Sequence, residues 1–168
     1  MRKAIIALVC LVAFAGVARA QQPAFHDSLL DHFVGTWVLQ GTIAGKQTTH
    51  DVTADWVLAH QYLRIHDVSR EKKSNGEPQY QAMVFVGWDQ QLSQYVCVWL
   101  DDYGWAADNA IGHAKRSGDE IPFLFQYSEG PFHTTFAYDK QSDTWEWRMD
   151  SEDKGKLKPF ARVKLTKK

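Results

Sequence analysis

From Val34 to the C-terminus, hydrophobic and polar residues alternate in short runs. The alternation is clearest in residues 144–151, where Trp145, Trp147 and Met149 are separated by charged residues. A period of two places successive side chains on opposite faces of a β-strand. The pattern therefore predicts strands with one face toward a core and the other toward water.

Turn-forming residues, such as those at 74–76 and 117–119, divide this part of the chain. The runs between them predict ten strands, at residues 34–42, 50–59, 62–70, 79–88, 94–101, 108–115, 120–127, 132–139, 144–151 and 159–166. A meander this long has exposed edges unless the sheet closes, and a two-sheet sandwich would need longer crossovers than this chain has. We expect an all-β fold, a single closed up-and-down antiparallel barrel of about ten strands.

A short N-terminal helix is predicted just before the first strand. Asp27 and Ser28 are suitable helix caps, and Leu29, Leu30 and Phe33 fall on one side at helical spacing. The segment Gly35-Thr36-Trp37 follows directly and opens the first strand.

Two middle strands are apolar on both faces, at residues 83–86 and 95–100. Strands of this kind are normally covered on both sides. Two covers are possible here: a homodimer interface, or the N-terminal segment of the same chain.

Residues 1–20 have the pattern of a secretory signal peptide. Arg2 and Lys3 precede an apolar run, and Ala18-Arg19-Ala20 resembles a cleavage site. We therefore expect an exported protein, periplasmic or secreted, with one domain at 21–168. The apolar run is too short to span a bilayer comfortably, so we expect no transmembrane segment.

Charge and cysteine content limit the partners of this expected mature chain. Removing residues 1–20 takes away three basic residues and no acidic one, so a net charge of −1 becomes −4. This balance argues against a nucleic-acid partner. Cys97 is the one cysteine left, so no internal disulfide can form, and its place in a strand predicts a buried, unreactive thiol.

The chain resembles a known superfamily in two places. Gly35-Thr36-Trp37 after a short helix is similar to the start of the calycins, which include lipocalins, fatty-acid-binding proteins and nitrobindins. Gly87-Trp88-Asp89, Tyr95 and Trp99-Leu100-Asp101 resemble an exported, lipocalin-like bacterial family of unknown function. The resemblance implies that Trp37 closes the barrel floor and that the lumen holds a small hydrophobic or amphipathic ligand. Residues 42–50 are too few for the helical lid of fatty-acid-binding proteins.

Indole side chains are the main candidates for the ligand-binding wall. The chain has seven tryptophans, and large aromatic groups give a cavity apolar walls with a polar edge. We predict ligand contacts by Trp37, Trp99, Trp145 and Trp147. The alternative is that these side chains fill the lumen completely.

Two polar candidates lie in the third predicted strand. Arg64 and His66 share one face, with Tyr62, and an inward Arg64 could bind a ligand carboxylate through two hydrogen bonds. Leu63, Ile65 and Asp67 share the other face. If that apolar face is the inner one, Arg64 and His66 point to solvent.

Catalytic and metal signatures are weak, and we predict neither a catalytic nor a metal site. The seven histidines lack zinc-binding spacing, and a nitrobindin-like haem protein would use one of His66, His113 or His133 as the iron ligand. An acid–base site would need Asp101 or Asp102 close to His113. The sequence leaves the cofactor undefined and favours binding over catalysis.

Overall fold

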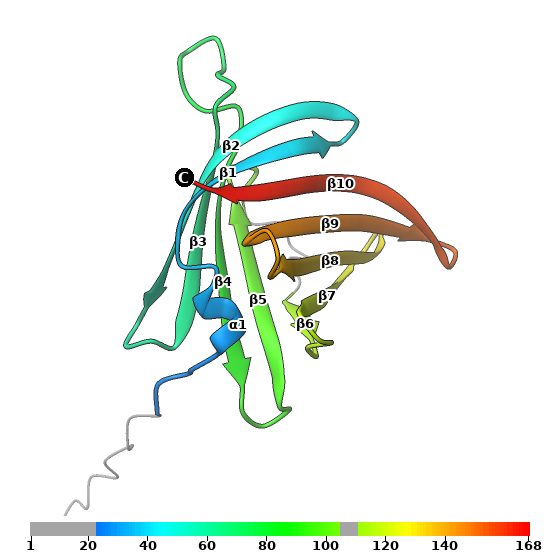
Figure 1. Ribbon diagram of the computed structural model, residues 1–168. Coiled ribbons are helices and arrows are strands. Elements are labelled where there is room, and N and C mark those ends of the chain that lie inside the picture. Colours follow the sequence, from blue (N-terminus) through cyan, green and yellow to red (C-terminus); the bar gives the residue numbers. More distant parts are fainter. Residues whose placement is uncertain (1–22, 105–110) are drawn as a thin grey trace, which may run out of the picture.

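The structure is a computed structural model and describes residues 23–104 and 111–168. It contains one short helix, α1 (Ser28–Asp31), and ten strands that form a closed antiparallel barrel (Figure 1). The strands are β1 (Gly35–Ile43), β2 (Lys46–Val57), β3 (Tyr62–Ser69), β4 (Gln81–Asp89), β5 (Gln94–Asp101), β6 (Gly112–Ala114), β7 (Glu120–Tyr127), β8 (Gly130–Asp139), β9 (Thr144–Asp153) and β10 (Lys156–Lys167). The predicted fold class is confirmed.

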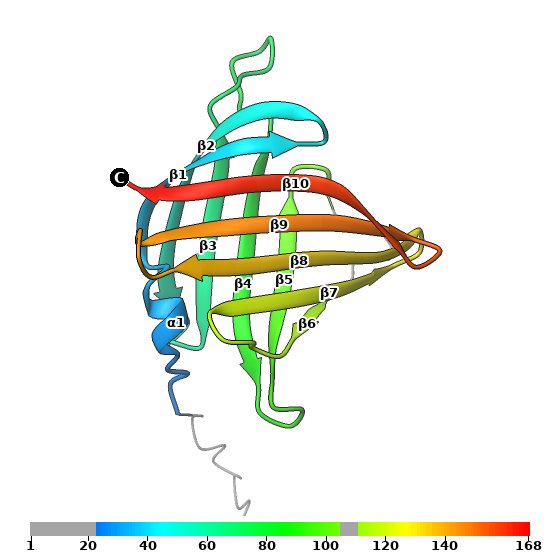
Figure 2. The ribbon, with the colours of Figure 1, turned by 45° about the vertical axis from the view of Figure 1, so that its right-hand side comes forward.

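Each strand pairs with its neighbours in sequence, and β1 pairs with β10 to close the sheet. Figure 2 shows β3–β5 crossing β8–β10 at a steep angle on opposite sides of the barrel. At the closure, Leu39 lies opposite Leu165 and Gly41 opposite Val163. A Cβ atom at residue 41 would lie 2.2 Å from the carbonyl oxygen of Arg162, and the φ angle of Gly41 is +152°. Glycine is therefore required where these two strands approach.

Strand bounds differ from the predicted ones mainly in β2 and β6. Residues 44–45 form a tight turn with φ angles of 48° and 77°, so β2 begins at Lys46, four residues earlier than predicted. β6 has only three residues, and part of the predicted strand 108–115 falls outside the described residues. The predicted signal peptide also lies outside them. Among the described residues no helix has the length and apolarity needed to cross a membrane.

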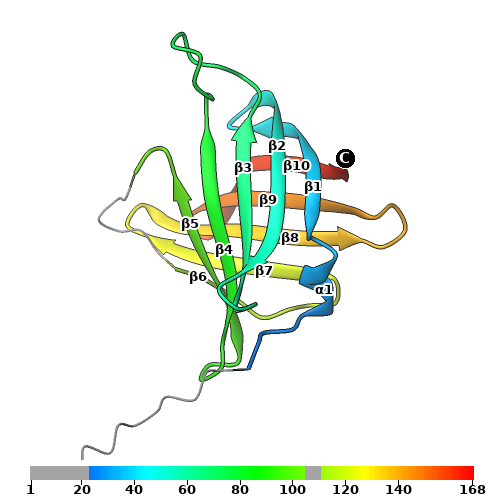
Figure 3. The same ribbon diagram turned by 90° about the vertical axis from the view of Figure 1, so that its left-hand side faces the viewer.

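One end of the barrel is closed by α1 and the residues after it (Figure 3). Asp27 caps the helix by accepting hydrogen bonds from the backbone N–H groups of Leu29 and Leu30, at 2.9 and 3.0 Å. Phe33 is fully buried, and its ring lies 4.7 Å from that of Trp145 and 6.0 Å from that of Trp147. The residue two positions after the helix thus inserts an aromatic plug into the barrel.

Trp37 fixes this plug to the first strand. Its indole Nε1–H donates a 2.7 Å hydrogen bond to the carbonyl oxygen of Phe33, and both residues are fully buried. The Lys167 ammonium lies 5.3 Å from the center of the Trp37 ring, at the C-terminal end of β10. Trp37 therefore links α1, β1 and the barrel closure, as expected for a floor residue.

The outer face of β4 and β5 remains apolar. Met83, Phe85, Val96 and Val98 are half-buried there, and Leu100 is more exposed. In the described part of the N-terminal segment, Phe25 contacts Trp56, Trp88 and Tyr95 at the closed end. Those contacts cover the end of the barrel and leave most of the apolar outer face of β4 and β5 uncovered.

We expect Trp37→Phe to destabilise the barrel by about 1–3 kcal/mol, because the Phe33 carbonyl then stays buried without its donor. Urea unfolding measures this free-energy change. Trp88→Phe is the matched control, because Trp88 is partly exposed and should lose less than about 0.5 kcal/mol. Equal losses in the two variants would contradict the structural role of the Trp37 hydrogen bond.

Candidate functional site

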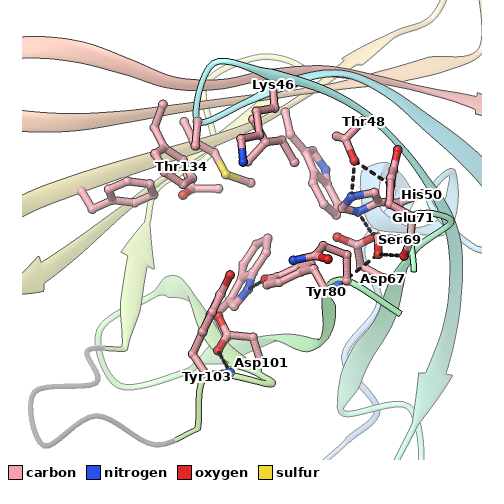
Figure 4. A pocket seen from close by; sticks show the side chains of 18 of the residues that line it. Lys46, Thr48, His50, Asp67, Ser69, Glu71, Tyr80, Asp101, Tyr103 and Thr134 are labelled. Atoms are coloured by element: carbon pink, nitrogen blue, oxygen red, sulfur yellow. Dashed lines mark hydrogen bonds and ion pairs between the residues drawn. The ribbon is translucent and has the colours of Figure 1, made fainter. Parts of the chain in front are cut away.

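A cavity of about 550 Å³ lies inside the barrel, and Figure 4 shows side chains that line it. It is lined by the last residues of β1, β3, β5 and β7 and by the first residues of β2 and β8. Since α1 leads into the start of β1, these positions lie at the other end of the barrel. The volume falls in the range of about 300–1,000 Å³ that is typical of small-molecule sites.

Aromatic and apolar side chains form one wall of the cavity. Trp99 and Trp147 both line it, and their rings meet edge to face at 5.8 Å and 70°. The rings of Phe125 and Tyr127 are nearly parallel, with 5.9 Å between their centers. The other large apolar lining residues are Ile43, Phe132, Met149 and Phe160. This wall suits the apolar part of a ligand.

A buried histidine–carboxylate contact lies on the opposite wall. His50 and Asp67 point inward from β2 and β3 and are only 3% and 2% exposed. Their Nδ1 and Oδ1 atoms are 2.7 Å apart, and His50 Nε2 lies 2.8 Å from the Thr48 hydroxyl. When a proton is on Nδ1, the histidine donates it to Asp67. The pair is thereby held in one orientation at the cavity surface.

Glu71 extends this network toward the mouth. Its carboxylate accepts hydrogen bonds from the Thr48 hydroxyl and the Thr49 backbone N–H, each at 3.1 Å. Burial by itself would raise the pKa of Glu71, but hydrogen bonds to the carboxylate outweigh that effect and hold the pKa below its usual value. Glu71 therefore presents a carboxylate at neutral pH.

Tyr80 lies between the polar and aromatic walls. Its hydroxyl oxygen accepts a 2.9 Å hydrogen bond from Trp99 Nε1. Burial raises the pKa of Tyr80, the Trp99 hydrogen bond lowers it, and the nearby carboxylates of Asp101 and Asp67 raise it further. The net direction is upward, so the side chain remains a neutral phenol.

The predicted ligand-binding residues do not all meet in the cavity. Trp99 and Trp147 line it, whereas Trp37 and Trp145 are fully buried and do not line it. The lumen is thus packed at one end and hollow at the other.

The inward orientation considered for Arg64 and His66 is wrong. On β3 the buried residues are Leu63, Ile65, Asp67 and Ser69, so the alternate residues face outward. Arg64 makes two 3.0 Å hydrogen bonds to Asp55 on the outer face. Leu63 and Ile65 determine which face of the strand points inward, because turning them to solvent would lose the free energy gained by burying them. Any ligand contact by Arg64 or His66 in the lumen would need the opposite orientation.

The other predicted histidines also lie away from the cavity. His113 Nδ1 lies 3.0 Å from the Gln94 amide, and His133 Nε2 lies 2.8 Å from Glu152. Among the described residues, no three His, Cys, Asp or Glu side chains are grouped to hold a metal ion. Asp101 lines the cavity, whereas Asp102 pairs with Lys73 at 3.0 Å. Neither carboxylate has a contact with His113 among the described residues.

The sequence analysis did not select His50 as a ligand-binding residue, although the pattern held a signal for the pair. Asp67 shares the alternation of Leu63 and Ile65, so a charged residue was already assigned to an apolar face. Its partner could not be identified from sequence, because His50 and Asp67 meet only through the β2–β3 register. Cys97 is fully buried, and burial raises the pKa of its thiol, which agrees with the predicted unreactive state.

No protein-family model matches this chain, and no curated protein matches it significantly. The fold is therefore the basis for classification. A closed ten-strand antiparallel barrel is consistent with a calycin-like architecture. The fold and the site together describe a barrel protein with a partly polar internal cavity.

A double-mutant cycle tests the buried pair. We expect Asp67→Leu to destabilise the protein by about 3 kcal/mol or more, because His50 stays buried without its carboxylate. His50→Leu combined with Asp67→Leu should cost less than the sum of the single changes, with a coupling of about 0.5–3 kcal/mol in urea unfolding.

The control is Arg64 with Asp55, which joins the same two strands on the outer face with both side chains about half exposed. Its coupling should stay below about 1 kcal/mol. Coupling of equal size in both pairs would show that the buried pair has no special energetic role.

Proposed function

We propose that this protein is an exported, calycin-type barrel that binds a small hydrophobic or amphipathic molecule in its lumen without catalysing a reaction. The observation that carries the proposal is the 550 Å³ cavity, with an aromatic wall on one side and the His50–Asp67 pair on the other. Apolar surface provides binding free energy, and a few fixed polar groups provide orientation.

The packing of the barrel supports a binding role. The closed end is filled by Phe33, Trp37 and Trp145, which are fully buried. Such a rigid base holds the open half in shape, and a largely preformed site reduces the entropy lost on binding. Export is proposed from the pattern of residues 1–20.

The direct test is native mass spectrometry of the protein purified from its own source, followed by release and identification of any bound molecule. Thr134→Trp should weaken binding about tenfold or more, because Thr134 is buried and lines the cavity, so an indole there occupies ligand space. Near-UV circular dichroism should confirm that the variant remains folded, since overpacking can cost about 1–3 kcal/mol.

Thr135→Trp is the control, because residue 135 faces outward on the same strand. It should retain the bound molecule in the same proportion as the original protein. Loss of the ligand in both variants, or in neither, would contradict binding in the lumen.

We propose self-association as a second function, favoured by the apolar outer stripe of β4 and β5. Phe85 lies opposite Val98 there, and Met83 lies opposite Leu100. Side chains on this stripe are half-buried or exposed, and a contiguous apolar patch of this kind is typical of a protein-binding surface. A second copy of the chain is the partner that we propose.

Sedimentation velocity tests this second function. Val98→Lys should convert a dimer to a monomer, because an ammonium group would be buried in the interface without a partner. Val38→Lys, on the outer face of β1, is the control and should leave the sedimentation coefficient unchanged. The same coefficient for Val98→Lys and the unaltered protein would exclude a dimer through this face.

A further inference from the structure

The charges on the cavity wall are mainly negative. Asp67, Glu71 and Asp101 are the acidic lining residues, and Lys46 and His50 are the basic ones, with His50 held against Asp67. Lys46 is exposed at the start of β2, whereas Asp67 is almost completely buried. Arg64 could have bound a ligand carboxylate from inside the lumen, but its guanidinium pairs with Asp55 on the outer face.

Several hydrogen-bond donors on the polar wall are already engaged. The Ser69 hydroxyl donates to the carbonyl oxygen of Glu71 and accepts from the Tyr80 backbone N–H, each at 3.0 Å. Both ring nitrogens of His50 have partners, and the Thr48 hydroxyl lies between His50 and Glu71. Besides Lys46, the remaining donors include the Tyr80 hydroxyl, which accepts from Trp99, and the buried Trp147 Nε1, which has no partner among the described residues. A ligand that needs several donors would therefore find few of them here.

Acceptors remain available. Asp67 contacts His50 through Oδ1, and its Oδ2 makes no hydrogen bond with any other described residue. Asp101 Oδ1 accepts from the Tyr103 backbone N–H at 3.1 Å. Carboxylate oxygens accept several hydrogen bonds each and donate none, so the wall is complementary to a ligand head group that donates.

Aromatic rings lie next to these acceptors. Trp99 is hydrogen-bonded to Tyr80, and the rings of Tyr80 and Tyr103 are 6.1 Å apart. Ring faces attract cations, and the attraction grows when the site excludes water. Carboxylates and aromatic faces together favour a positive head group more strongly than either favours it alone.

We propose that the lumen selects cationic amphiphiles: a protonated amine lies at the wall of Asp67, Asp101 and Tyr80, and its apolar tail packs against Phe125, Phe132 and Trp147. This inference rests on the proposed ligand-binding function and adds the chemical class of the ligand. The carboxylates accept hydrogen bonds from the ammonium N–H groups. The low polarity of the aromatic wall strengthens the attraction between the charges.

Three probes with one tail test the selection: decylammonium, decanol and decanoate, each below its micelle concentration, by isothermal titration calorimetry at pH 7 and low salt. Decylammonium should bind about tenfold or more tightly than decanol, which corresponds to about 1.4 kcal/mol. Decanoate should bind more weakly than decanol. Added salt should reduce the preference for decylammonium.

Variants assign the preference to the wall. Asp67→Asn and Asp101→Asn should each weaken decylammonium binding several-fold and leave decanol binding unchanged, so decanol reports that the lumen is intact. Asp55→Asn removes an outer-face carboxylate and should change neither affinity.

Each other outcome has a defined meaning. Equal affinity for the three probes would overturn the charge selection and leave binding in the lumen standing. Tightest binding of decanoate, lost in Lys46→Gln, would overturn it in favour of an anionic ligand. Failure of all three probes to bind, together with no bound mass in native mass spectrometry, would overturn the proposed function as well.

Discussion

The pairing of β1 with β10 is the constraint on which the rest of the structure depends. It turns a ten-strand meander into a barrel without exposed edge strands, and so satisfies the backbone hydrogen bonds of the terminal strands. The close approach at Gly41 shows how little space this closure leaves. Once the sheet is closed, inward side chains share a fixed volume, and each must either fill it or line a cavity.

The two ends of that volume are used differently. At one end, Phe33, which follows α1, packs against Trp145, and Trp37 holds Phe33 by a hydrogen bond to its carbonyl oxygen. The other end has no comparable plug among the described residues and contains the cavity. A buried ion pair gains little stability over well-packed apolar residues, because desolvation offsets its attraction. We therefore attribute the His50–Asp67 pair to the site more than to the stability of the barrel.

Much of the fold was predictable from local pattern. The alternation around Trp145, Trp147 and Met149 predicted inward residues that the structure confirms as buried. The early start of β2 was missed because residues 46–49 are all polar and carry no hydrophobic alternation. Of the predicted wall, Trp99 and Trp147 line the cavity. The sequence did not show that Trp37 and Trp145 would be used in packing, because the four indoles have similar local patterns.

The sequence by itself determined the strand periodicity, the helix before β1 and the presence of enough large apolar side chains to fill a barrel. Those properties depend on neighbours along the chain and on the two-residue repeat. Only the tertiary structure decided which face of β3 points inward, that His50 meets Asp67, and where packing ends and the cavity begins. These outcomes depend on strand register and on the closure of the sheet, which bring together residues far apart in sequence.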